Sequence, residues 1–164
     1  MKIRTDFVTN SSSSSFCSIS IESADLARLF SNLLDWIREA DEEPYILFDR
    51  CEIKGDVVRI EQWEDTFFVP PHSLEGIPKA LDLHLQESLE LSVLRDEPID
   101  VLEELSSRAD EITSSIVSAS WRYGKNVWGE FECEVPPGKS DSYSATLEYD
   151  ARTGKQTYSE GWES

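Results

Sequence analysis

Residues 17–40 read CSISIESADLARLFSNLLDWIREA, and the hydrophobic period of this stretch changes once, at Ser23. Before Ser23, apolar and polar residues alternate, which is typical of a β-strand with one buried face. After Ser23, apolar residues recur at the spacing of an amphipathic helix, over about 24–40. Ser23 itself is a favourable N-cap residue. The stretch therefore predicts a strand, a cap and a helix in direct succession, which favours an α+β fold.

The same two periods recur on both sides of this stretch. Residues 1–7 alternate as a second strand, and residues 45–63 predict a β-hairpin that turns at Gly55-Asp56. Between 76 and 112, two apolar stripes, each with a proline near its start, predict an αα-hairpin. Additional apolar residues predict that the first of these helices is buried on two sides: Leu83, Leu91 and Val93.

The last third of the chain predicts an antiparallel β-meander over about 113–163. Turn residues at 124–126, at 136–138 and at 150–154 separate four alternating runs. We expect Tyr158 and Trp162 to face inward from the last strand. Together the patterns predict one α+β domain over 1–164, with antiparallel sheet strands, an N-terminal amphipathic helix and a central αα-hairpin.

The composition supports a folded core. The chain has 164 residues, 39% of them hydrophobic, and 7 Phe, 5 Tyr and 5 Trp, which is more aromatic content than disordered acidic chains carry. No uninterrupted apolar run approaches the length of a membrane span, and no apolar segment follows the N-terminal cations as in a secretory signal. Three widely spaced cysteines, Cys17, Cys51 and Cys133, favour reduced thiols. We therefore expect a cytoplasmic protein.

The net charge of −18 comes from 33 acids and 15 bases. Such a charge disfavours direct binding to nucleic acid or to anionic lipid. The surplus concentrates in residues 73–112, which hold 11 acids and 3 bases. Either the acids only keep the surface solvated, or they form a face that docks on a basic partner groove. For the second alternative we predict these partner-binding residues: Asp96, Glu97, Asp100, Glu103, Glu104 and Glu111.

A run of five serines, Ser11 to Ser15, lies between the first two predicted strands. Serine hydroxyls compete for local backbone hydrogen bonds, so the run favours a loop. Residues 5–16 contain no glycine, which argues against a phosphate-binding loop. The alternatives are a plain connector and a mobile recognition loop formed by these residues: Asn10, Ser11, Ser12, Ser13, Ser14 and Ser15.

The N-terminal segment Lys2-x-Arg4-x-x-Phe7-Val8-Thr9-Asn10, followed by Ser11 to Ser15 and Phe16, resembles a segment shared by many uncharacterised proteins of Firmicutes and their phages or mobile elements. The usual form there is K-x-R-x-G-F-V-[ST]-N-S-S-S-S-S-F, and Asp6 stands where glycine is common. The resemblance covers about sixteen residues. It implies a bacterial or mobile-element source and carries no catalytic residues.

Catalysis by a cysteine needs a thiolate beside a base. His72 and His84 are the available histidines, and Cys51 in the predicted hairpin is the candidate thiol. The ordinary interpretation is a buried thiol and a loop histidine. No C-x-x-C or H-x-x-x-H spacing occurs in the sequence. We therefore predict no catalytic residue, no metal site and no cofactor.

Three functions fit these observations. The leading one is a non-catalytic, acidic protein–protein interaction protein. In a sharper form it is a phage or mobile-element inhibitor that presents a carboxylate face, which mimics nucleic acid, to the basic groove of a partner. One alternative is a structural or assembly component that uses exposed Trp128 and Trp162 as an interface, with an oligomeric state that the sequence leaves open. The other is a small cytosolic enzyme that uses Cys51 or a carboxylate pair.

Overall fold

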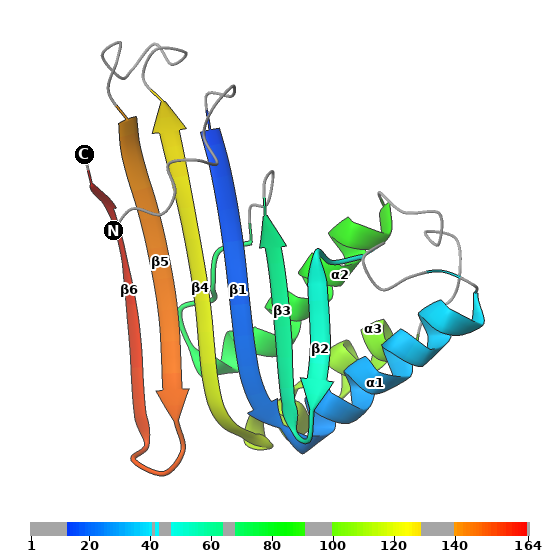
Figure 1. Ribbon diagram of the computed structural model, residues 1–164. Coiled ribbons are helices and arrows are strands. Elements are labelled where there is room, and N and C mark those ends of the chain that lie inside the picture. The colour runs from blue at the N-terminus through cyan, green and yellow to red at the C-terminus, as the bar shows by residue number, and fades with distance from the viewer. Residues whose placement is uncertain are drawn as a thin grey trace.

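The computed structural model describes residues 13–40, 42, 47–63, 68–90, 100–128 and 140–163. Within these ranges, six strands form one antiparallel sheet in the order β2-β3-β1-β4-β5-β6, and four α-helices lie on one side of it (Figure 1). The strands are β1 Ser13–Ser23, β2 Arg50–Lys54, β3 Val57–Trp63, β4 Ile116–Trp128, β5 Ser140–Asp150 and β6 Lys155–Glu163. The helices are α1 Ala24–Glu39, α2 Ile77–Glu90, α3 Asp100–Ser107 and α4 Ala109–Ser114, with a 3-10 turn, η3, at Leu74–Gly76. The predicted α+β class is confirmed.

The junction between β1 and α1 forms as the sequence predicts. The Ser23 side chain accepts a hydrogen bond from the Leu26 backbone N–H at 3.1 Å, and Asp25 lies in the first turn, where a carboxylate is favourable. The apolar stripe of α1 then packs on β1, β2 and β3. Within the described ranges, no helix combines the length and the apolar composition that a membrane crossing requires.

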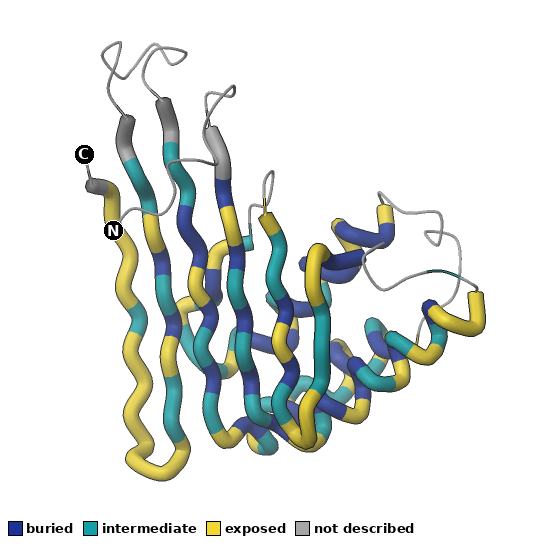
Figure 2. Tube along the Cα trace, viewed as in Figure 1, coloured by how far each residue is buried: buried dark blue, intermediate teal, exposed yellow. Residues whose placement is uncertain are grey.

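Each strand of the sheet has one side toward the helices and one side open to solvent. On β1, Cys17, Ile19 and Ile21 are buried, whereas the residues between them are only half-buried. Antiparallel register continues this pattern across the sheet, because cross-strand partners share a face. Ile19, for example, lies opposite Trp121, the largest fully buried side chain. Figure 2 shows the alternation of buried and less buried residues along the central strands.

Two of the predicted turns are present, those at residues 55–56 and 150–154. Gly55 adopts φ 58° between β2 and β3, and Gly154 adopts φ 70° before β6. This left-handed conformation strains residues that carry a Cβ, so glycine is the favoured residue at each turn. The Gly154 N–H donates to the Asp150 carbonyl oxygen at 2.8 Å, which closes the β5–β6 hairpin.

The turn predicted at residues 124–126 is wrong, because β4 continues through it to Trp128. Gly124 pairs with Phe16 on one side and with Ser144 on the other. The glycine serves a close approach rather than a turn, since a Cβ there would lie 2.4 Å from the Phe16 ring. Three described strands, β4 to β6, therefore stand where four shorter ones were predicted. Residues 129–139 lie outside the described ranges.

The helical region differs from the prediction at two points. Arg108 interrupts the second predicted helix and divides it into α3 and α4. On α2, Leu83 is 52% exposed, so its predicted burial is wrong. One stripe of α2, which includes Leu81 and Leu85, covers the core, and Leu83 falls on the opposite side. Leu91 and Val93 lie outside the described ranges. The αα-hairpin itself is present, because α2 packs against α3.

Candidate functional site

The predicted partner-binding residues belong largely to α3 and α4. Asp100, Glu103 and Glu104 lie on α3, and Glu111 lies on α4. Asp100, Glu103 and Glu111 are exposed, whereas Glu104 is half-buried. The structure thus brings four of the six residues onto one helical segment. The remaining two lie outside the described ranges: Asp96 and Glu97.

Arg108, between α3 and α4, gathers three carboxylates around its guanidinium. Its nitrogens lie 2.9 Å from Glu104, 3.1 Å from Glu111 and 3.4 Å from Asp25. Arg28 of α1 extends the group, with a nitrogen 3.3 Å from a Glu104 oxygen. Sequence reasoning missed this network, because Asp25 and Arg108 are 83 residues apart. The network links α1 to α3 and α4.

The pKa of Glu104 reports the same network. Partial desolvation raises this pKa, but hydrogen bonds from Arg108 and Arg28 outweigh that effect and lower it overall. The pKa of Arg108 is raised by its hydrogen bonds to Glu111 and Glu104. Glu104 and Glu111 are therefore engaged within the chain, and Asp100 and Glu103 offer the more accessible carboxylates.

Charge is distributed unequally between the helices and the open face of the sheet. The four α-helices hold three cations, Arg28, Arg38 and Lys79, and eleven carboxylates: Asp25, Asp35, Glu39, Asp82, Glu87, Glu90, Asp100, Glu103, Glu104, Asp110 and Glu111. Of the strand side chains that the structure describes, the open face holds five cations and five carboxylates: Arg50, Lys54, Arg59, Arg122, Lys155, Glu22, Glu52, Glu61, Glu148 and Asp150. The acidic surplus of the described elements thus lies on the helical layer.

The prediction that the whole serine run is a loop is wrong for its last three residues. Ser13, Ser14 and Ser15 belong to β1 and pair with Val127, Asn126 and Lys125 of β4. The β4 strand is long enough to continue the ladder past Phe16, so backbone pairing overrides the local preference of serine. Asn10, Ser11 and Ser12 lie outside the described ranges, and a recognition role for the run stays a prediction.

The open face contains a shallow hollow of about 240 Å³ over β1, and sequence reasoning missed it. Serines of β1 and β4 line it together with longer charged side chains of β3 and β4. Its lining residues are Ser18, Ile19, Ser20, Arg59, Glu61, Ser120 and Arg122. The sequence signal was the alternation of serine with isoleucine in residues 18–21, which places short polar side chains together on one face.

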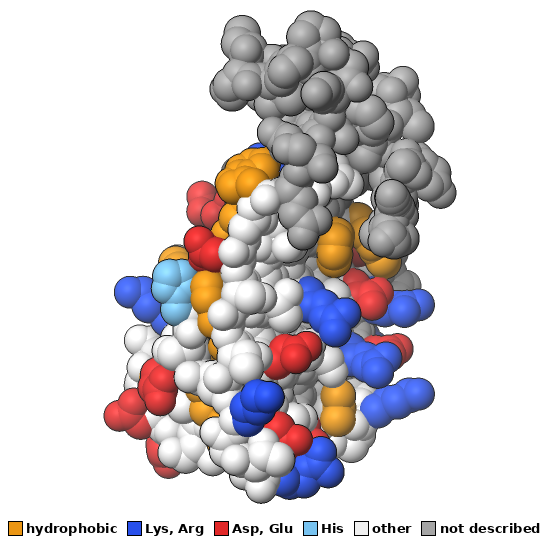
Figure 3. Space-filling view, turned by 90° about the vertical axis from the view of Figure 1, so that its left-hand side faces the viewer, with side chains coloured by type: hydrophobic (Ala, Val, Ile, Leu, Met, Phe, Trp, Pro, Cys, Tyr) orange, Lys and Arg blue, Asp and Glu red, His pale blue; other side chains and the backbone are white. Residues whose placement is uncertain are grey.

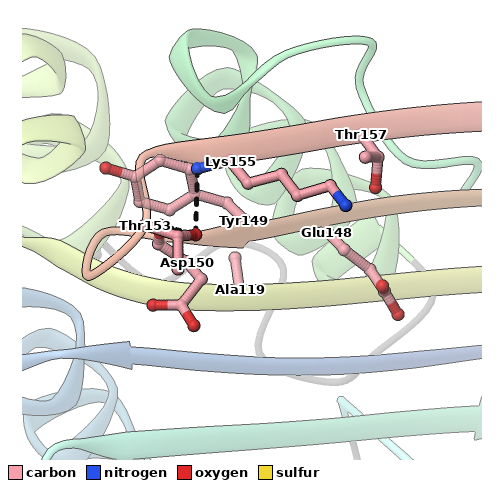
Figure 4. Close-up of a pocket in the computed structure, with 7 residues that line it drawn as sticks. All are labelled: Ala119, Glu148, Tyr149, Asp150, Thr153, Lys155 and Thr157. Atoms are coloured by element: carbon pink, nitrogen blue, oxygen red, sulfur yellow. Dashed lines mark hydrogen bonds between the residues drawn. The ribbon is translucent and has the colours of Figure 1, made fainter.

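A second hollow, of about 360 Å³, lies at the β5–β6 turn (Figure 4). Asp150 and Lys155 line it from either side of the turn, and the Lys155 backbone N–H donates to Thr153 Oγ1 at 3.2 Å. Hydrogen bonds from the Arg152 side chain and backbone lower the pKa of Asp150. This carboxylate is therefore held in its charged form by the turn, which suits turn stability better than acid–base exchange.

The two described thiols occupy environments that disfavour the thiolate. Burial raises the pKa of Cys17 to about 12, despite a hydrogen bond with Trp121 that lowers it. Burial likewise raises the pKa of Cys51 to about 12, and the neighbouring Glu52 adds to the effect. Because the thiolate is the nucleophile, both groups are weakly reactive near neutral pH. Cys133 lies outside the described ranges.

The two histidines lie in contrasting places. His84 is buried on α2, its Nε2 lies 2.9 Å from Gln62 Oε1, and its ring stacks on Phe68 with centroids 3.8 Å apart. Burial lowers the pKa of His84 to about 4. His72 is exposed, beside Tyr158 and Glu160 of β6. The geometry makes His84 a neutral core group and His72 a surface group.

Among the described residues, no group of three or more His, Cys, Asp or Glu side chains is placed to hold a metal ion. Comparisons of the chain with protein-family models, with curated proteins and with solved structures found no match.

Proposed function

We propose that this chain is a non-catalytic protein–protein interaction protein that docks its acidic helical layer on a basic partner. The observation that carries the proposal is the charge difference between the two sides of the sheet. The described helices hold eleven carboxylates against three cations, whereas the described strand side chains of the open face hold five of each sign.

A need for solubility alone does not require this segregation. Interspersed charges of both signs, as on the open face, keep a surface solvated at low electrostatic cost. Carboxylates collected on one layer repel one another within a Debye length of roughly 8–10 Å. A basic partner would relieve that repulsion and release bound counterions, so concentrated charge favours association.

Exposed carboxylates lie on all four helices, and α3 and α4 carry the described residues that were predicted to bind a partner. Asp100, Glu103 and Asp110 are exposed there. Arg108 pairs with Glu104 of α3, Glu111 of α4 and Asp25 of α1, which fixes the position of the segment that carries the exposed acids. Carboxylates held on a fixed segment can take the Lys/Arg contacts that nucleic-acid phosphates would otherwise make, with the same release of counterions.

In its sharper form, the proposal is a cytoplasmic inhibitor, of phage or mobile-element origin, that occupies the basic groove of a nucleic-acid-handling protein. The acidic helical layer is the observation that favours binding in a basic groove. The resemblance of the N-terminal segment is the observation that favours a phage or mobile-element origin. Such an inhibitor binds protein and not nucleic acid, in keeping with the net charge of −18.

The test compares two triple charge reversals that change the net charge equally. One variant carries Asp100→Lys, Glu103→Lys and Asp110→Lys on the helical layer. The matched control carries Glu52→Lys, Glu61→Lys and Glu148→Lys on the open face. The intact protein is immobilised, bacterial extract is passed over it at low and at high salt, and captured proteins are identified and titrated with each variant.

We expect a captured nucleic-acid-binding protein whose affinity falls steeply with salt and about tenfold or more with the helical variant, since several charge contacts are lost together. The control should change the affinity by less than about threefold, because surface charges away from the contact contribute little. Equal effects of the two variants, or binding that ignores salt, would contradict the proposal. The captured protein should also lose its nucleic acid when this chain binds.

A further inference from the structure

β6 ends the sheet among the described strands, and its outer side has no described strand beside it. The strand is nine residues long, Lys155–Glu163. The four α-helices lie toward the β2 end of the sheet (Figure 1). The segment around η3 reaches the inner face of β6, where the Leu74 N–H donates to Gln156 Oε1 at 2.7 Å, and leaves the outer edge of the strand open among the described residues. Such an edge presents a row of backbone donors and acceptors that can pair with another strand.

The sequence of β6 is complementary to itself in the antiparallel direction. If two copies pair about Ser159, Lys155 of each copy lies opposite Glu163 of the other. Gln156 then lies opposite Trp162, and Tyr158 lies opposite Glu160. All nine residues of the strand pair in this register, and both ends bring opposite charges together.

Neighbouring registers are less favourable. Side chains alternate between the two faces of a strand. A register that still joins like faces of the two copies must therefore be shifted by two residues. Pairing about Glu160 would place that carboxylate directly opposite its own copy, where like charges repel. Pairing about Tyr158 would place Lys155 opposite Gly161 and lose both oppositely charged pairs.

The exposed Trp162 side chain at this edge also favours pairing. Trp162 is 61% exposed, and its ring lies against that of Tyr143, with centroids 5.2 Å apart. In the view onto the β6 edge, hydrophobic side chains lie among acidic and basic ones (Figure 3). Pairing about Ser159 places Trp162 diagonally across from Tyr158 of the second copy, within reach of an aromatic contact.

We propose that β6 is a homodimer interface, at which two copies of this chain pair antiparallel about Ser159 into one continuous twelve-stranded sheet. The two-fold symmetry makes the contact isologous, so each pair other than that of Ser159 with its own copy occurs twice. Both helical layers lie on the same side of the joined sheet and away from the axis. The contact is a single strand wide, so the dissociation constant should be on the order of micromolar.

The test is sedimentation equilibrium of the full chain over a concentration series that spans the micromolar range. We expect a reversible monomer–dimer equilibrium. Lys155→Glu, and separately Glu163→Lys, should each raise the dissociation constant at least about tenfold, because each creates two repulsive pairs per dimer. The double variant K155E/E163K should restore the wild-type constant. Lys54→Glu on β2, at the other edge of the sheet, is the matched control and should have little effect.

Circular dichroism of each variant checks that the monomer remains folded, and the Glu163→Lys arm remains informative if Lys155→Glu disturbs the β5–β6 hairpin. A chain that stays monomeric throughout would overturn the proposal. So would a dimer that neither single variant weakens, or a double variant that fails to recover. If the full chain is monomeric and dimerises only after removal of residues 1–7, the edge belongs to that predicted strand instead of to a second copy. The inference does not rest on docking by the helical layer, because the two surfaces lie apart.

Discussion

The two sides of the sheet differ sharply in how far their side chains are buried, even between residues that are neighbours in the sequence. Trp121 and Arg122 are neighbours on β4, yet the Trp121 side chain is fully buried under the helices and 62% of the Arg122 side chain is exposed. On β1, buried Ile19 and half-buried Ser20 repeat the contrast. One side of each strand therefore determines stability, while the other is free to vary in charge and shape. The helical layer adds a second difference, because it carries the acidic surplus.

The largest expected effect tests this division on a single strand. Trp121→Ala should lower the free energy of unfolding by about 3–5 kcal/mol, because it removes the largest buried side chain and leaves a cavity. Arg122→Ala, one residue away on the open face, should change it by no more than about 0.5 kcal/mol. Urea denaturation followed by circular dichroism measures both.

Similar losses for the two variants would show that something covers the open face and that its side chains are part of a core. In that case the comparison between the two sides of the sheet would fail.

Much of this architecture could be predicted from local patterns. The alternation in residues 17–21, the cap at Ser23 and the helical stripe of α1 each depend on short-range periodicity, and all three are confirmed. The hairpin turn at Gly55 is also confirmed. It could be predicted because glycine is the residue that most readily adopts the positive φ such turns require.

What could not be predicted depends on contacts between distant residues. Gly124 reads as a turn residue, but the Phe16 ring occupies the space of its missing side chain. The local sequence of Ser13 to Ser15 predicts a loop, but these residues form part of β1 because they pair with β4. Glu104 pairs with Arg28 of α1 and with Arg108. Local sequence patterns show that Glu104 is acidic, but they do not reveal these ion pairs, because Arg28 is distant in the sequence. The partner-binding role of the acidic residues stays a prediction.

A second prediction concerns the buried histidine of α2, His84. Burial lowers the pKa of His84 to about 4 from an ordinary value of 6.5. As the pH falls through this interval, the unfolded chain takes up a proton while the folded chain does not, so unfolding becomes more favourable. His84 should therefore remove about 3 kcal/mol of stability between pH 6.5 and pH 4, with full stability above that window.

The measurement is the free energy of unfolding as a function of pH for three proteins. His84→Gln should flatten the decline over this interval, because the group that titrates is gone. His72→Gln is the matched control on the exposed surface and should retain the wild-type slope. An unchanged slope in His84→Gln would place the acid sensitivity in the carboxylates.

The smallest of the three effects tests how the sheet is joined to the helical layer. Ser23 is fully buried and accepts from the Leu26 N–H. Its hydroxyl also lies 2.6 Å from Ser115 Oγ, which donates to the Ile112 carbonyl oxygen, so Ser23 donates to Ser115. Ser23→Ala should cost about 1–2 kcal/mol, because it removes a helix cap and a buried hydrogen bond together. Ser20→Ala, on the open face of the same strand, should cost less than about 0.5 kcal/mol. Urea denaturation of both variants decides the matter: if they match, the cap contributes nothing beyond an ordinary surface serine, and the covered face owes its stability to apolar packing alone.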